Sequence, residues 1–81
     1  MVNLESFREW LQANTTYSAN VIRDTVSRLK RANSILEWND EEVYQFYLER
    51  TDEYKAMPAT VRSQVKKAVK LYWSFRQSHK G

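Results

Sequence analysis

Few side chains in this sequence are suited to covalent chemistry. The chain of 81 residues has no cysteine, five tyrosines and one histidine, His79. A nucleophilic serine or tyrosine needs a base or a strongly polarised substrate beside it, and we expect the only histidine to be a solvated residue near the end of the sequence. Glu41 and Glu42 are adjacent, so on a helix they point to different faces and form no carboxylate pair. The sequence therefore predicts no catalytic residues, and we interpret the chain as a non-enzyme.

Metal and cofactor sites are also not predicted. One histidine and no cysteine cannot supply the usual ligands of a zinc site. The only glycine, Gly81, is terminal, so no glycine-rich loop is present to hold a phosphate group. No apolar run approaches the roughly 20 residues that span a bilayer, and the first ten residues include Glu5, Arg8 and Glu9 rather than a signal sequence. We expect a cytoplasmic protein with no cofactor, no metal and no membrane partner.

The charged residues are distributed unevenly along the chain. Residues 1–36 carry a net charge of +2, residues 37–54 carry −6, and residues 55–81 carry +7 with no acidic residue. Two basic segments on either side of an acidic one favour a surface that binds a polyanion. The alternative interpretation is that these are ordinary solvated helix faces.

The spacing of apolar residues predicts an all-α fold. One glycine and one proline are too few for the turns of a small β-protein. Apolar residues at helical spacing predict four helices over residues 4–13, 18–32, 40–51 and 58–77. We expect a single domain over residues 1–81, built as a compact four-helix bundle and ending in a polar tail at 76–81.

Local signals predict how these helices begin and which faces are buried. Ser18 is the expected N-cap of the second helix. Asn39 and Glu42 predict a capping box for the third helix, with Trp38 and Val43 in contact across it. Tyr47 is also expected to face inward, whereas Tyr44 and Tyr54 are expected at the half-buried surface. The main core is expected to contain Phe7, Ile22, Val26, Leu29, Phe46, Val65 and Tyr72.

The order of these signals resembles the SAM-like N-terminal domain of phage-type integrases, the core-binding domain of tyrosine recombinases. In that family the first helix carries an aromatic residue followed by a Leu pair, at the positions of Phe7, Trp10 and Leu11 here. The second helix begins with a Ser-Pro-Asn-Thr-Ile-Arg type of run, which corresponds to residues 18–23. The last helix begins with a pair such as Thr60-Val61 and ends in an aromatic cluster, here Tyr72, Trp73 and Phe75. The similarity extends from about Leu4 to Phe75, with two departures: Ala19 replaces the usual proline, and Val21 replaces a threonine whose hydroxyl could meet a phosphate.

The resemblance implies an orthogonal SAM-like bundle that binds duplex DNA during integration and recombination. In the family, the second and fourth helices face the duplex, and a separate catalytic domain closes a clamp around it. That domain cleaves DNA with a tyrosine assisted by Arg, Lys and His residues; its His-x-x-Arg element has no counterpart here, because Lys80 and Gly81 follow His79. The implied partners are duplex DNA, such a catalytic domain and other recombinase protomers.

The candidate DNA-binding residues lie on the two basic helices. Arginine and lysine side chains would supply most of the affinity through phosphate contacts, and short polar side chains on the same surface could meet phosphates or base edges. The candidates are Ser18, Asn20, Arg23, Ser27, Lys30, Arg31, Arg62, Lys66, Lys67 and Lys70. Arg62, Lys66 and Lys70 follow at intervals of four residues and are expected on one ridge of the last helix.

Two other hypotheses remain open from the sequence. A small helical protein-interaction module would use the acidic segment to bind a basic partner, with Tyr44, Tyr54 and Trp73 as exposed anchors. A membrane-surface helix is the weakest alternative, because the last helix needs its apolar stripe to close the core of so small a domain.

Overall fold

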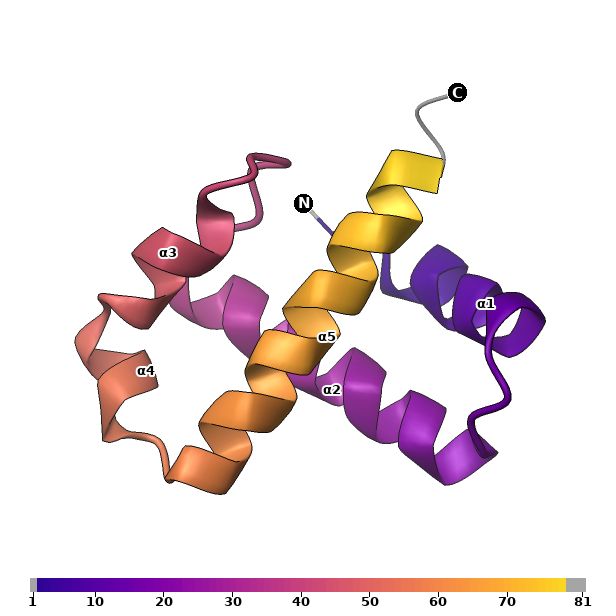
Figure 1. Ribbon diagram of the computed structural model, residues 1–81, viewed down its shortest axis with the longest axis horizontal. Coiled ribbons are helices and arrows are strands. Elements are labelled where there is room, and N and C mark those ends of the chain that lie inside the picture. Colours follow the sequence, from indigo (N-terminus) through magenta and orange to yellow (C-terminus); the bar gives the residue numbers. More distant parts are fainter. Residues whose placement is uncertain (1, 79–81) are drawn as a thin grey trace.

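The computed structural model describes residues 2–78, which form five α-helices and no β-strand. They are α1 (Leu4–Asn14), α2 (Ala19–Ile35), α3 (Tyr44–Glu49), α4 (Asp52–Ala56) and α5 (Ala59–Ser78). The long helices α2 and α5 cross each other, with α1 on one side of the crossing and the short helices α3 and α4 on the other (Figure 1). The predicted all-α class is confirmed. The predicted helices at 4–13, 18–32 and 58–77 correspond closely to α1, α2 and α5.

The two N-terminal helices begin where local capping predicts. The side chain of Asn3 accepts a hydrogen bond from the backbone N–H of Ser6, and that of Ser18 accepts one from the N–H of Val21. Each bond satisfies one of the N–H groups that a helix leaves unpaired in its first turn. The prediction of Ser18 as the N-cap is therefore confirmed.

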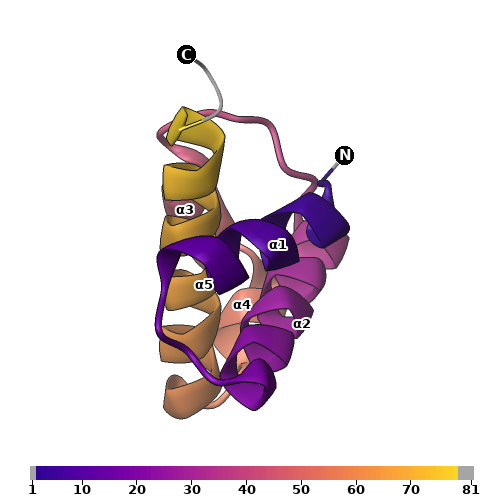
Figure 2. The same ribbon diagram turned by 90° about the vertical axis from the view of Figure 1, so that its right-hand side faces the viewer.

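An aromatic cluster joins α1 to α5, and α2 packs against the same core. The ring of Phe7 meets that of Tyr72 edge to face, with centroids 5.0 Å apart, and the hydroxyl of Tyr72 accepts a hydrogen bond from the N–H of Asn3. Trp38, in the connection after α2, also packs edge to face with Tyr72. Figure 2 shows α1 lying across α2 and α5. Of the predicted core residues, Phe7, Ile22, Leu29, Val65 and Tyr72 are buried, and Val26 is half-buried against them.

The prediction of one helix over residues 40–51 is wrong. The backbone is irregular up to Val43, and two short helices, α3 and α4, follow with Thr51 as the N-cap of the second. Asn39 caps no helix; its side chain accepts a hydrogen bond from the N–H of Glu41 in a local turn. Asp40 has a φ of 56°, a left-handed conformation that interrupts a helix and that aspartate tolerates better than most residues. The predicted capping box with Glu42 is therefore absent.

The helix α3 starts later than predicted, and the residues that it buries are not the predicted ones. Tyr44 and Leu48 are fully buried, whereas Phe46 and Tyr47 are 55% and 53% exposed. Val43, which was expected at an apolar contact at the start of the helix, is 45% exposed. A helical wheel gives the spacing of inward residues but not which of two apolar stripes faces the core. In α3 the stripe that carries Tyr44 faces the core. The Tyr44 hydroxyl donates hydrogen bonds to the carbonyl oxygens of Ala32 and Leu36 at the end of α2.

Two further segments differ from the prediction. The helix α2 continues past residue 32 to Ile35, and the side chain of Asn33 accepts a hydrogen bond from the N–H of Trp38, which returns the chain towards the core. The helix α5 extends one residue past the predicted helix 58–77, so residues 76–78 of the predicted polar tail are helical, and Arg76 forms an ion pair with Asp40. Predictions for His79 and the rest of the tail lie outside the described residues. Within residues 2–78, no helix is both long and apolar enough to cross a membrane.

Candidate nucleic-acid interface

The exposed side of α2 gathers most of the candidate residues of that helix. Asn20, Arg23, Ser27, Lys30 and Arg31 are all exposed, whereas Ile22, Leu29 and Ala32 on the other side are buried. We call these five exposed residues the α2 face. The only acidic residue of α2 is Asp24. The amphipathic pattern of the helix therefore places cations and short polar side chains together in solvent.

A shallow hollow at the C-terminal half of α2 is lined by three cations and two hydroxyls. Its residues are Ser27, Arg28, Lys30, Arg31 and Ser34. The Ser34 hydroxyl donates its one proton to the carbonyl oxygen of Arg31, so the three cations are the main hydrogen-bond donors of this hollow. Guanidinium, ammonium and hydroxyl groups are the side chains that usually contact DNA phosphates. This hollow is the strongest concentration of such groups along α2.

Ser18 stands at the N-terminus of α2, outside the α2 face. Its hydroxyl oxygen caps the helix at Val21 at a distance of 3.3 Å, so its established role is structural. A helix N-terminus attracts anions through its remaining N–H groups, but the structure assigns Ser18 no second partner among the other candidates.

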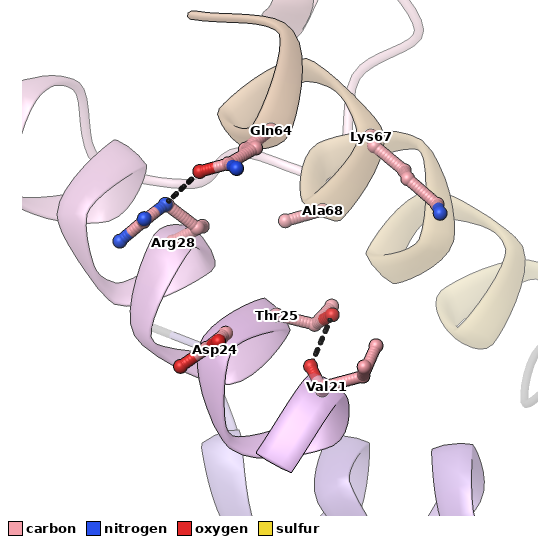
Figure 3. Close-up of a pocket in the computed structure, with 7 residues that line it drawn as sticks. All are labelled: Val21, Asp24, Thr25, Arg28, Gln64, Lys67 and Ala68. Carbon is pink, nitrogen blue, oxygen red and sulfur yellow. Dashed lines mark hydrogen bonds between the residues drawn. The ribbon is translucent and has the colours of Figure 1, made fainter. Parts of the chain in front are cut away.

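A groove runs between α2 and α5. It is lined by Val21, Asp24, Thr25, Arg28, Gln64, Lys67 and Ala68. In Figure 3 the Arg28 and Gln64 side chains point towards each other across this groove, and the Nε–H of Arg28 donates a hydrogen bond of 2.9 Å to Oε1 of Gln64. Lys67 stands at the edge of the groove, with its ammonium group 5.2 Å from the centre of the Tyr17 ring. Arg28 of α2 and Lys67 of α5 are therefore the two cations, one from each basic helix, that line the same groove.

The other three α5 candidates lie on a ridge towards the acidic segment. Arg62 is half-buried, and its carbonyl oxygen accepts a hydrogen bond from the Tyr54 hydroxyl. Lys66 is exposed. Lys70 borders a small cavity that it shares with Trp38, Glu41, Glu42, Tyr44, Gln45, Val69 and Trp73. We call Arg62, Lys66 and Lys70 the α5 ridge; two glutamates are near one end of it, and burial limits the reach of Arg62 at the other.

The α2 face and the α5 ridge do not form one continuous surface. The two helices pack together through their buried sides, which carry Leu29 and Ala32 on α2 and Val65 and Ala68 on α5. Their solvent sides consequently point away from each other, and Figure 2 shows α5 and α2 as separate columns. A straight duplex meeting the whole α2 face leaves most of the α5 ridge without contact.

Arg28 was missed by the sequence analysis. It lies on the flank of α2 that faces α5, between the buried and exposed sides. Only the crossing of the two helices brings Gln64 and Lys67 to that flank, and no local pattern in the sequence encodes this crossing. One signal in the sequence could have indicated it: Arg28 is three residues before Arg31 and four residues after Asp24, so the three side chains are neighbours on the helix surface.

The buried tyrosines are structural. Burial raises the pKa of Tyr44 to about 12 and also raises the pKa of Tyr54, with a smaller contribution from the nearby carboxylate of Glu49. Both hydroxyls donate hydrogen bonds to backbone carbonyls, so both side chains stay protonated at neutral pH. Their predicted exposure as binding anchors is wrong, and Trp73 is half-buried. In the part of the chain that the structure describes, no group of three His, Cys, Asp or Glu residues is placed to hold a metal ion.

Comparison with known proteins adds no family to this description. No family model matches the chain, and neither a curated protein nor a solved structure gives a match.

Proposed function

We propose that this chain is a DNA-binding module that contacts duplex DNA mainly through phosphates, with the α2 face as its principal contact surface. The observation that carries the proposal is the exposed row of Arg23, Lys30 and Arg31 on one face of α2, together with the exposed side chains of Asn20 and Ser27. Such a row can neutralise several phosphates at once, and this electrostatic contribution supplies nearly all of the affinity of non-specific binding.

The hollow on α2 gives the proposal a specific geometry. Arg28, Lys30 and Arg31 border it together with two serine hydroxyls, so one phosphate seated there has both opposite charge and hydrogen-bond donors within reach. Asn20 extends the same face towards the N-terminus, and both Asn20 and Ser27 can reach base edges when the helix lies in a groove of the duplex.

The resemblance to the integrase core-binding domain leads to a finer form of the proposal. In this form of the proposal, the all-α fold is a variant of the SAM-like orthogonal bundle, and the chain serves DNA integration or recombination without catalysing it. A separate catalytic domain would contact the far side of the duplex. This finer form is supported by the residues that match the family pattern between Leu4 and Phe75, especially residues 18–23 at the start of α2.

A titration with duplex DNA tests the proposal. The 81-residue protein, labelled with ¹⁵N, is titrated with a short duplex at low salt while backbone amide shifts are followed. We expect the largest shifts in residues 19–34, a Kd on the order of 10⁻⁴–10⁻⁶ M at physiological salt, and a steep decrease of log K with log salt concentration. An absence of α2 shifts at low salt, or shifts confined to α3 and α4, would contradict the proposal.

A further inference from the structure

Four large apolar side chains are exposed in the described part of the chain, and three of them are neighbours. Val43, Phe46 and Tyr47 are 45%, 55% and 53% exposed at the start of α3, and the fourth is Val21 on α2. The Phe46 and Tyr47 rings meet edge to face with centroids 5.7 Å apart. The guanidinium of Arg50 lies 4.5 Å from the centre of the Phe46 ring, in a cation–π contact. Contiguous exposed apolar surface of this kind marks interaction sites more often than scattered apolar residues do.

The charged residues near Phe46 in the sequence are acidic apart from Arg50, which lies over its ring. Glu42 lies four residues before Phe46, in the turn ahead of α3, and Glu49 follows it by three residues, within a segment whose net charge is −6. We call Val43, Phe46 and Tyr47, with the two glutamates, the α3 face. Such a surface repels phosphates and suits a partner with an apolar recess bordered by cations.

The same chain carries a recess that cations border, with an apolar part inside a mostly polar lining. The groove between α2 and α5 has Val21 and Ala68 among its apolar residues, and Arg28 and Lys67 border it (Figure 3). Asp24 also lines it, but the two cations exceed this single negative charge. The fourth exposed apolar residue, Val21, thus lies in the region of the protein that complements the other three.

We propose that the α3 face of one copy of this protein docks into the α2–α5 groove of a second copy, with Phe46 entering the recess and Glu42 and Glu49 facing Arg28 and Lys67. The two surfaces lie on different sides of the molecule, because α3 and the N-terminal half of α2 are on opposite sides of α5 (Figure 1). Each copy can therefore use both surfaces at once. A symmetric contact between two α3 faces is disfavoured, since it would bring like charges together.

Head-to-tail association of this kind has a specific signature. Each added copy leaves one α3 face and one groove unoccupied, so assembly continues beyond the dimer unless a ring closes. Sedimentation velocity of the full chain at low salt should give a weight-average mass that rises past the dimer with concentration. Added salt should weaken the association, because its polar contacts lie at a solvent-exposed rim.

Two single substitutions separate the two surfaces. Phe46→Ala removes the aromatic side chain from the α3 face, and Val21→Glu places a carboxylate in the groove. Val21 is the third residue of α2 after the Ser18 N-cap, where glutamate completes a capping box, so this variant should fold at least as well as the parent. Each variant alone should associate at least about tenfold more weakly, as expected when a central aromatic anchor or its recess is lost. Val21→Gln, which supplies the same cap without charge, is the matched control and should weaken association less.

An equimolar mixture of the two variants decides the matter. The Phe46→Ala protein keeps its groove and the Val21→Glu protein keeps its α3 face, so the mixture should form one-to-one dimers and stop there. A parent chain that stays monomeric up to about 1 mM, well above the Kd range of ordinary specific complexes, would overturn the proposal. So would a mixture that stays monomeric, or association that responds to Phe46→Ala but not to Val21→Glu, which would indicate a symmetric contact between α3 faces. Thermal unfolding of each variant shows that any loss is not caused by misfolding.

Discussion

The helices α2 and α5 both carry an excess of basic residues but differ in what surrounds their cations. On the α2 face, Arg23, Lys30 and Arg31 are exposed. On α5, Arg62 is half-buried, Lys70 borders the cavity that includes Glu41 and Glu42, and Arg76 is paired with Asp40. A count of lysines and arginines gives α5 the larger charge, yet the acidic segment offsets part of it. Tertiary neighbours, not charge content alone, decide which basic helix is available to a polyanion.

The largest expected effect comes from neutralising the α2 hollow. Replacing Lys30 and Arg31 by Gln should reduce the slope of log K against log salt by about 1.8, which corresponds to about 60-fold weaker duplex binding at 0.1 M salt if affinity at 1 M is unchanged. Gln has nearly the same helix propensity, and surface changes usually alter stability by less than about 0.5 kcal/mol. Fluorescence anisotropy with a labelled duplex over a series of salt concentrations measures both quantities.

The matched control removes the same charge from the other basic helix. Lys66→Gln with Lys70→Gln should change the slope by less than half as much, because this ridge faces away from the α2 face and lies near acidic residues. Equal effects from the two pairs would mean that only net charge matters. A larger effect from the α5 pair would assign the principal contact to the α5 ridge instead.

The next effect concerns the attachment of the acidic segment. Tyr44→Phe removes a buried hydroxyl that donates hydrogen bonds to the carbonyls of Ala32 and Leu36, and should lower the free energy of unfolding by about 1–2 kcal/mol. Urea denaturation of the variant and the parent at pH 7 measures this difference. A loss below about 0.3 kcal/mol, small against a typical net hydrogen bond, would show that these bonds do not anchor α3.

The same residue predicts a dependence of stability on alkaline pH. The pKa of Tyr44 is about 12 in the fold against 10.0 for a free tyrosine. Because the folded pKa is the higher one, its stabilising contribution is complete below pH 10 and is lost as the pH rises from 10 to 12. The loss should amount to roughly 2–3 kcal/mol, with Tyr54 adding in the same direction. Denaturation from pH 8 to 12 should show a smaller loss for Tyr44→Phe, and equal losses would exclude Tyr44 as the cause.

The smallest effect is expected at the contact between Asp40 and α5. Asp40 accepts hydrogen bonds from Nε1 of Trp38 and from the guanidinium of Arg76, and this bonding raises the pKa of Arg76. Both charged side chains are 36% exposed, so solvent screens much of their attraction. Asp40→Asn should cost about 0.5–1 kcal/mol of stability and should raise duplex affinity slightly by removing a negative charge. Thermal unfolding and anisotropy check the two changes, and a decrease in duplex affinity would contradict the assigned role of the acidic segment.

The long helices were predictable because their signals are local. Ser18 caps α2 through a residue three positions away, and the buried residues of α1, α2 and α5 recur at helical spacing. The candidate residues of α2 were placed on its solvent side for the same reason. Helical periodicity and capping depend on neighbours within about one turn, so they can be predicted directly from the sequence.

The segment between Trp38 and Met57 was not predictable in this way. Either of its apolar stripes could have faced inward, and the outcome depended on where Tyr44 meets the end of α2. Whether Arg23 and Lys66 share a surface likewise depended on the crossing of α2 over α5. The sequence by itself therefore determined the all-α class, the long helices and their caps. Only the tertiary structure decided which aromatics of α3 are exposed and which cations stand together, because burial and long-range contact depend on how the helices pack against one another.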